Sequence, residues 1–220
     1  MPAAGPMKLD LKKQFKELYS PSAKECSLVQ VPSLQFAMID GQIEAGRMPG
    51  DSPAFAEGIG ALYGASYTLK FMSKKRAEDP IDYGVMALEG LWTTPAGGAD
   101  YIGSDQWMWT LMIMQPDHIG PGMFADAVDQ LRKKYVKDKK DPAVLDRLRL
   151  ERFEEGLCVQ VMHIGPYSDE PATLMRMGEF AGRNGYAFTG AHHEIYLGDP
   201  RAAKPENLKT ILRHPVVALA

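Results

Sequence analysis

The stretch Leu157–Pro171, LCVQVMHIGPYSDEP, decides the fold of this chain. Its apolar and β-branched residues up to Ile164 predict a strand, and Gly165-Pro166 predicts a turn. Asp169-Glu170-Pro171 then predicts a helix start, because acidic residues and a proline favour the first helical turn. Two more strands are predicted after this helix, over residues 188–197 and 208–213. The order is therefore strand, helix, strand, strand.

The first half of the chain has the same order. A strand broken at Pro32 is predicted over residues 29–40, and a helix over 52–72 starts at Asp51-Ser52-Pro53. Strands over 83–92 and 106–114 follow. We therefore predict an α+β fold: a tandem βαββ repeat that forms one antiparallel sheet, with helices on one face and a ligand groove at the pseudo-twofold axis.

The same pattern predicts the domain organisation. Residues 1–25 are expected to form a surface tail or short helix, and residues 26–216 a single domain. Its two halves, about 27–118 and 148–216, are joined by a helical linker around 123–137, which carries an amphipathic stripe.

Composition excludes several classes of function. The 220 residues contain 25 Lys and Arg against 28 Asp and Glu, so the net charge of -3 supplies no attraction for nucleic acid. No apolar run is long enough to cross a membrane. The two cysteines, Cys26 and Cys158, indicate free thiols and a cytoplasmic location. We expect no cofactor, and no metal site because the histidines lack zinc-ligand spacing.

The segment 192–197, HHEIYL, is the most informative candidate site. On a strand, His192, Glu194 and Tyr196 point to one face and the more aliphatic alternate residues to the other. The aliphatic set is expected to face the helices. The carboxylate, imidazole and phenol are then expected to line the open face, although a merely solvated sheet face is the alternative.

Three tryptophans and a second glutamate extend this candidate site. Trp107 and Trp109 share a strand face and Trp92 ends the preceding strand, so they predict either an aromatic wall for a planar ligand or ordinary core packing. Glu89 occupies nearly the place in the first repeat that Glu194 occupies in the second. It is therefore expected either in the groove, as a second carboxylate across the pseudo-twofold axis, or as an exposed or capping glutamate near a strand end.

Several motifs resemble those of one family in combination. They are Phe36–Gly41, Ala61–Phe71, Leu88–Trp92, Gly165–Pro171 and His193–Pro200 continued by Pro205–Arg213. Together they are similar to the GyrI-like small-molecule-binding family over residues 27–216. The resemblance implies a central groove with Glu194 as polar anchor and aromatic walls, to which we assign Tyr167 as well. Some stand-alone members look like hydrolases that open the cyclopropane ring of DNA-alkylating compounds.

Two functions remain open on the sequence alone. In the first, the protein binds hydrophobic aromatic xenobiotics and hydrolyses cyclopropane-bearing compounds, with Glu194 as general base and Tyr196 as hydrogen-bond donor to the ligand carbonyl. In the second, it is a non-catalytic module that binds aromatic or cationic molecules as a drug sink, or regulates a protein partner. No surface motif in the sequence identifies such a protein partner.

Overall fold

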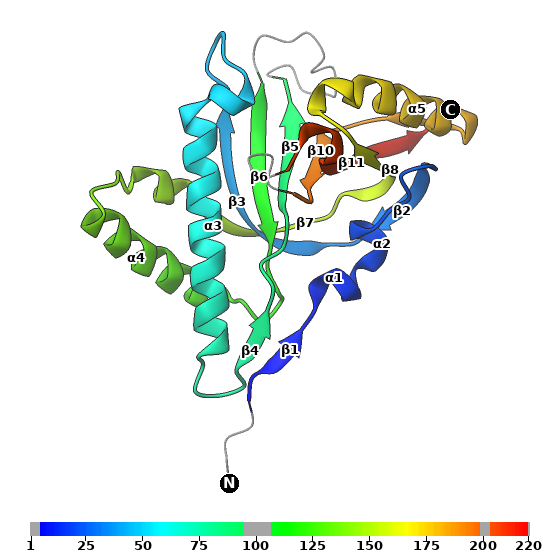
Figure 1. Ribbon diagram of the computed structural model, residues 1–220. Coiled ribbons are helices and arrows are strands. Elements are labelled where there is room, and N and C mark those ends of the chain that lie inside the picture. Colours follow the sequence, from blue (N-terminus) through cyan, green and yellow to red (C-terminus); the bar gives the residue numbers. More distant parts are fainter. Residues whose placement is uncertain (1–4, 95–106, 199–202, 220) are drawn as a thin grey trace.

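The two predicted repeats follow one another in the computed structural model, which describes residues 5–94, 107–198 and 203–219 (Figure 1). The first repeat consists of β3 (Leu34–Gln42), α3 (Pro53–Lys74), β5 (Leu88–Thr93) and β6 (Met108–Met114). The second consists of β8 (Gly156–Ile164), α5 (Glu170–Arg183), β10 (His192–Tyr196) and β11 (Lys209–Ala218). The predicted tandem βαββ order is confirmed, while the predicted strand start at residue 106 lies outside the described residues.

One antiparallel sheet joins the repeats, in the strand order β2-β8-β11-β10-β5-β6-β3-β7. Here β2 spans Ser27–Val31 and β7 spans Arg149–Phe153, while β9 (Tyr186–Phe188) pairs with the end of β11. At the centre β5 pairs with β10, and Glu194 lies opposite Gly90. Since β11 and β8 follow on one side as β6 and β3 follow on the other, a pseudo-twofold axis passes between β5 and β10.

Local sequence explains where the two repeat helices begin. The Ser52 side chain accepts a hydrogen bond from the Phe55 N–H at 3.1 Å, and Pro53 occupies the first turn of α3. Pro171 occupies the first turn of α5, which ends at the Asn184 cap. Both helix starts were predicted from these residues.

Both helices cover the same face of the sheet, as predicted. A Cβ at Gly58 of α3 would lie 2.9 Å from the Trp109 ring of β6, and Met177 of α5 packs in one cluster with Leu212 of β11. Opposite residues on antiparallel strands point to the same side, and Leu212 lies opposite Glu194. The face covered by α3 and α5, which we call the helix face, is therefore the face of Glu194.

This placement shows that one prediction is wrong: His192, Glu194 and Tyr196 do not point away from the helices. The prediction assumed that only the helix face is buried, so that the more aliphatic set must lie there. The other face is buried as well, because the N-terminal segment covers it. Tyr19 reaches Glu89, the residue opposite Ile195, and Ile195 is fully buried. Apolar residues on one side therefore do not identify the helix side.

The N-terminal segment consists of β1 (Met7–Leu9), α1 (Leu11–Gln14) and α2 (Lys16–Tyr19). β1 pairs in parallel with β4 (Ile81–Tyr83), and Leu11, Leu18 and Tyr19 are buried. Short helices were predicted here, but the predicted surface location is wrong for these residues. We call the side of the sheet that this segment covers the N-terminal face.

The predicted helical linker is α4 (Pro121–Lys137), which lies beside α3 (Figure 1). The two helices approach closely, since a Cβ at Gly64 of α3 would lie 3.0 Å from the Leu131 side chain of α4. Short 3-10 turns complete the described elements: η1 (Pro49–Asp51), η2 (Ala143–Arg147), η3 (Tyr167–Asp169) and η4 (Pro205–Asn207). Within the described ranges, no helix combines the length and apolar character needed to cross a membrane.

Candidate functional site

The central strand pair brings together the side chains of the candidate site. On the helix face, β10 presents His192, Glu194 and Tyr196, and β5 presents Trp92 and Gly90 beside them. Gly90 lies directly opposite Glu194, and a Cβ there would lie 3.1 Å from Trp92 Nε1 and 3.2 Å from Tyr196 Oη. A glycine at this position therefore lets the two ring systems approach the strand backbone beside the carboxylate.

Aromatic rings surround this carboxylate on both sides of the pseudo-twofold axis. Trp92 Nε1 donates a hydrogen bond to Tyr196 Oη at 3.0 Å. The Trp92 ring also contacts Phe55 of α3, with ring centroids 5.3 Å apart, and Trp107, at 5.7 Å edge to face. Tyr167 of η3 meets Tyr196 edge to face at 6.2 Å. We call these five residues the aromatic cluster. All of them except Phe55 were assigned a role toward the ligand in the sequence analysis.

A second carboxylate, Glu170, lies beside Glu194. Glu170, His192 and Glu194 each offer a ligand atom, and these three atoms lie within 4.8 Å of one another. His192 Nε2 is 3.3 Å from Glu194 Oε1. Burial, followed by the negative charge of Glu194, raises the pKa of Glu170 to about 9. This acidic cluster holds negative charge in a buried place, and its donor atoms are of the kinds that bind a proton, an organic cation or a metal ion.

The Tyr196 hydroxyl is kept protonated by the same surroundings. Burial and then the charge of Glu194 raise its pKa well above the ordinary value, and a hydrogen bond with Glu194 acts in the same direction. Tyr196 therefore serves as a hydrogen-bond donor rather than as an acid.

Trp109 does not belong to the aromatic wall that the sequence suggested. It is only 2% exposed, and its ring lies so close to Gly41 and Gly58 that a Cβ at either would be within 3 Å of it. Phe55 covers it edge to face at 5.5 Å. The alternative interpretation, core packing beneath α3, is therefore the correct one for Trp109. Trp107 stays half-buried at the rim beside Trp92.

The predicted correspondence between Glu89 and Glu194 is wrong, because it puts Glu89 on the wrong face of the sheet. The register sets Glu194 opposite Gly90 and Glu89 opposite Ile195, so the two glutamates point to opposite sides of the sheet. The comparison of the repeats was one residue out of register, and such a shift exchanges the two faces of a strand. Glu89 therefore cannot add a second carboxylate beside Glu194.

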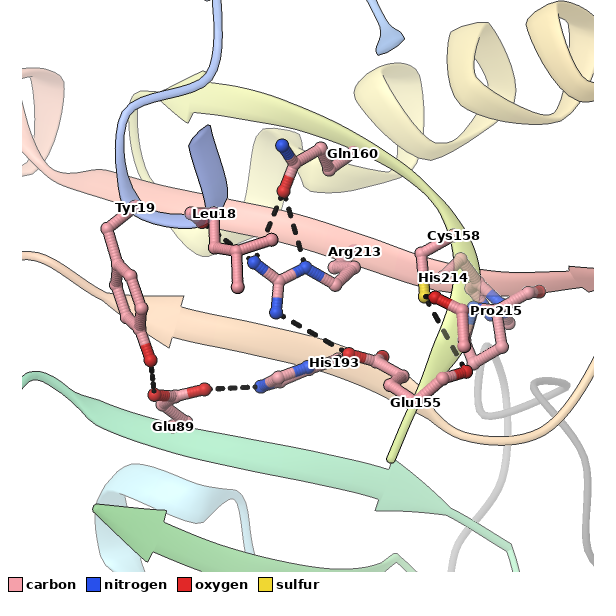
Figure 2. A network of polar contacts seen from close by, with 11 residues as sticks. Leu18, Tyr19, Glu89, Glu155, Cys158, Gln160, His193, Arg213, His214 and Pro215 are labelled. Atoms are coloured by element: carbon pink, nitrogen blue, oxygen red, sulfur yellow. Dashed lines mark hydrogen bonds and ion pairs between the residues drawn. The ribbon is translucent and has the colours of Figure 1, made fainter. Parts of the chain in front are cut away.

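Glu89 instead belongs to a buried polar network on the N-terminal face, shown in Figure 2. Its two oxygens are held by Tyr19 Oη at 2.5 Å and by His193 Nε2 at 3.0 Å. His193 Nδ1 lies 3.0 Å from Glu155, which also pairs with Arg213 at 3.5 Å. Arg213 donates in turn to the Leu18 carbonyl at 2.7 Å. The network fastens α2 to the centre of the sheet.

The charges of this network support one another. Burial alone would lower the pKa of His193, but Glu155 and Glu89 raise it to about 9. Burial alone would raise the pKa of Glu155, but His193 and Arg213 bring it below the ordinary value. His193 and Glu155 are therefore both charged at neutral pH, and the network is a structural ion-pair system.

Glu170 is a candidate site residue that the sequence analysis missed. Asp169-Glu170-Pro171 was interpreted only as a helix start, which it is. One signal was available: the matching position before the proline of α3 is Ser52, whose side chain caps the helix. A large, acidic residue in place of a small capping residue indicates a second role at this position.

Comparisons with known proteins agree with this architecture. The family model of the GyrI-like small molecule binding domain matches residues 24–217. A hydrolase from Listeria innocua is 37% identical, with a TM-score of 0.80, over 95% of this chain and 100% of that one. An uncharacterized conserved protein from the same organism is also 37% identical, with a TM-score of 0.82 and the same coverage. No curated protein matches this chain.

A more distant similarity concerns the fold alone. The C-terminal domain of EcmrR is 12% identical, with a TM-score of 0.51, over 89% of this chain and 98% of that one. The repeat, the sheet and the position of the acidic and aromatic clusters at the pseudo-twofold axis thus accompany a family match over nearly the whole chain. The chain belongs to the family of GyrI-like small-molecule-binding domains.

Proposed function

We propose that this protein binds hydrophobic aromatic xenobiotics at the helix face of β5 and β10 and hydrolyses those that carry a cyclopropane ring. The observation that carries the proposal is the carboxylate of Glu194 beside Gly90, with Trp92 and Tyr196 hydrogen-bonded to each other next to it. A base among aromatic rings combines a place for a planar ligand with a group that activates water.

The roles of the residues follow from their surroundings. Glu194 takes a proton from water as the oxygen of that water attacks the cyclopropane carbon. When the ligand is bound, Tyr196, which stays protonated, donates its one hydroxyl hydrogen to the ligand carbonyl instead of to Glu194, and negative charge develops on that carbonyl during ring opening. Its own oxygen is oriented by the Trp92 N–H.

The remaining assignments concern the shape of the site. Trp92, Trp107 and Tyr167 contact the flat faces and edges of the ligand, and His192, two residues earlier on the same strand, orients Glu194. The 37% identity to a hydrolase from Listeria innocua supports an enzyme of this class. We further propose a cytoplasmic location, supported by the free cysteines Cys26 and Cys158.

Product analysis with a cyclopropane-bearing alkylating compound tests the proposal. The wild type is expected to convert it to the ring-opened alcohol, and Glu194→Gln to lower turnover by about 100-fold or more with little change in binding of a neutral aromatic ligand. Glu179→Gln, an exposed glutamate on α5, is the control and is expected to match the wild type. If Glu194→Gln turned the compound over as fast as the wild type, Glu194 would not be the general base.

A non-catalytic binding module is the second candidate. It is favoured by one observation: among the described ion pairs, those of Glu170 and Glu194 include no lysine or arginine, so an organic cation would find uncompensated negative charge there. Recovery of the compound unchanged, at one equivalent per chain, would support this function against hydrolysis.

A further inference from the structure

The acidic cluster on the helix face joins two carboxyl groups that are far apart in sequence. Glu170 is the first residue of α5 and Glu194 the middle residue of β10. One carboxylate oxygen from each glutamate and one ring nitrogen of His192 all lie within 4.8 Å of one another. Glu170 is 6% exposed and the Glu194 side chain 13% exposed. Two carboxyl groups that are ordinarily ionised therefore lie next to each other in a site that is largely shielded from water.

Their charges are not balanced in the way that buried carboxylates usually require. Oε1 of Glu170 is buried and has no hydrogen-bond partner among the described residues. The neighbouring base is His192, 3.3 Å from Glu194. Two adjacent buried carboxylates cannot both stay ionised without a large cost in free energy, so one of them must be neutralised. Among the residues that the structure describes, no positive charge is therefore paired with Glu170.

We propose that Glu170 and Glu194 form a one-proton pair, in which Glu170 holds the proton and Glu194 is the ionised member in the resting site. The assignment follows burial, because the more deeply buried oxygen gains more from being neutral. The use of this pair in ring opening rests on the function proposed above, whereas the resting proton does not.

The electrostatic surroundings of Glu170 agree with this assignment. Its pKa is raised to about 9 by burial and by the charge of Glu194. The elements packed most closely against α5 include β8, β9 and η3. The other titratable side chains of these elements and of β10 and β11 near the Glu170 end of α5 are His163, Tyr167, Asp169, His192, Tyr196 and His214. None of these appears among the causes that shift the pKa of Glu170.

The pair completes the chemistry of ring opening. Glu194 removes a proton from water, the water oxygen bonds to the cyclopropane carbon, and the C–C bond of the ring breaks. The electron pair of that bond moves to the ligand carbonyl oxygen. The pair, now holding two protons, gives one to this oxygen and returns to its one-proton state. Tyr196 keeps its own proton throughout, so it supplies only a hydrogen bond.

Infrared spectroscopy tests the resting proton without any substrate. The full-length protein at pH 7 is expected to show the carbonyl stretch of a protonated carboxyl group, and the band should disappear as the pH rises through about 9. Glu170→Gln should remove the band, and Glu179→Gln should leave it unchanged. In Glu194→Gln the band should disappear at a lower pH, because the neighbouring charge is gone. Absence of the band in the wild type, or its survival in Glu170→Gln, overturns the proposal.

Kinetics test whether the proton is used. With a cyclopropane substrate, Glu170→Gln is expected to lower kcat by about 100-fold or more and to lose the decline of activity above pH 9. A variant with normal kcat and the same pH profile would overturn the catalytic step while leaving the infrared result standing. If no compound is turned over by the wild type, the proposed hydrolysis fails and the infrared band still decides the resting proton.

A metal ion is the competing way to neutralise the cluster. Titration with Zn²⁺ after dialysis against a chelator is expected to give no change in melting temperature that depends on Glu170. Tight binding of one Zn²⁺ by the wild type and not by Glu170→Gln would show a metal site with ligands Glu170, His192 and Glu194, and would overturn the one-proton pair.

Discussion

The two faces of the central sheet each hold a buried pair of glutamates, and the pairs are built in opposite ways. On the N-terminal face, Glu89 and Glu155 are separated by His193, and Arg213 pairs with Glu155. On the helix face, Glu170 and Glu194 stand beside each other, and His192 is the neighbouring base within the described part of the chain. The first arrangement pairs its charges within the protein and stabilises the fold, although one oxygen of Glu155 has no hydrogen-bond partner among the described residues. The second leaves a charge for a proton or ligand to satisfy.

The largest effect is expected on the N-terminal face. Glu155→Gln removes the carboxylate that balances His193 and Arg213, and breaking a buried ion pair leaves an uncompensated charge. We expect a loss of about 3–5 kcal/mol in the free energy of unfolding, measured by urea denaturation. The neighbouring Glu154→Gln, at an exposed position, should cost less than about 0.5 kcal/mol. Equal effects of the two variants would contradict the structural role of the network.

The next largest effect is expected in the pH dependence of stability, and it comes from the network on the N-terminal face. The pKa of His193 in the folded protein, about 9, is above its ordinary value, so its contribution is complete below about pH 6.5 and is lost as the pH rises through 9. At about 1.4 kcal/mol per pKa unit, the loss is on the order of 3 kcal/mol. Glu155 has a lowered pKa, so its contribution is lost on the acid side. Thermal unfolding of His193→Gln between pH 6.5 and 9 should show a flatter profile than the wild type.

Two tyrosine hydroxyls, one on each face, allow a direct comparison of hydrogen bonds, with smaller expected losses of stability. Tyr19→Phe removes the hydrogen bond to the charged Glu89 and is expected to cost about 2 kcal/mol, the value typical of bonds to ionised groups. Tyr196→Phe removes the acceptor of the Trp92 N–H and the O–H that bonds to Glu194, but the Glu194 side chain is 13% exposed and water can replace that second bond, so the cost should be smaller, about 1 kcal/mol. Tyr67→Phe, whose side chain is half exposed on α3, is the control. Chemical denaturation measures all three, and a larger cost for Tyr196→Phe would reverse the comparison.

The smallest change in stability is expected for Glu170→Gln. Since Glu170 is already uncharged at pH 7 in the proposed pair, a neutral amide of the same shape should alter the free energy of unfolding by less than about 1 kcal/mol. The same exchange at Glu155 is expected to cost several times more. A loss of more than 3 kcal/mol at Glu170 would show that the helix face is also a structural ion-pair system.

Local sequence was sufficient to predict the order of the repeated elements, but not every strand. The strands predicted over residues 83–92 and 188–197 are each divided in the structure, into β4 and β5 and into β9 and β10. Proline beside an acidic or capping residue fixed the starts of α3 and α5, and the break at Pro32 separated β2 from β3. These signals act within a few residues, so no knowledge of the rest of the chain was needed. Fold class and repeat order followed from them.

The candidate site was predicted only in part, because its geometry depends on contacts between distant segments. Alternation along β10 correctly separated His192 and Glu194 from His193, but the side that α3 and α5 cover could not be read from one strand. The N-terminal residues Leu18 and Tyr19 bury the opposite face and remove the expected polarity difference. Glu89 was misplaced because the register of β5 against β10 is a property of two strands.

Gly90 has a further consequence for how a ligand is oriented. The scaffold is nearly symmetric about the axis between β5 and β10, yet Gly90 occupies the place related to Glu194, and Trp92 the place related to Tyr196. An elongated molecule lying across both strands would therefore meet an indole at one end and the acids at the other. Turning it end over end would exchange these contacts. A twofold frame with unequal ends therefore gives such a molecule one preferred direction of binding.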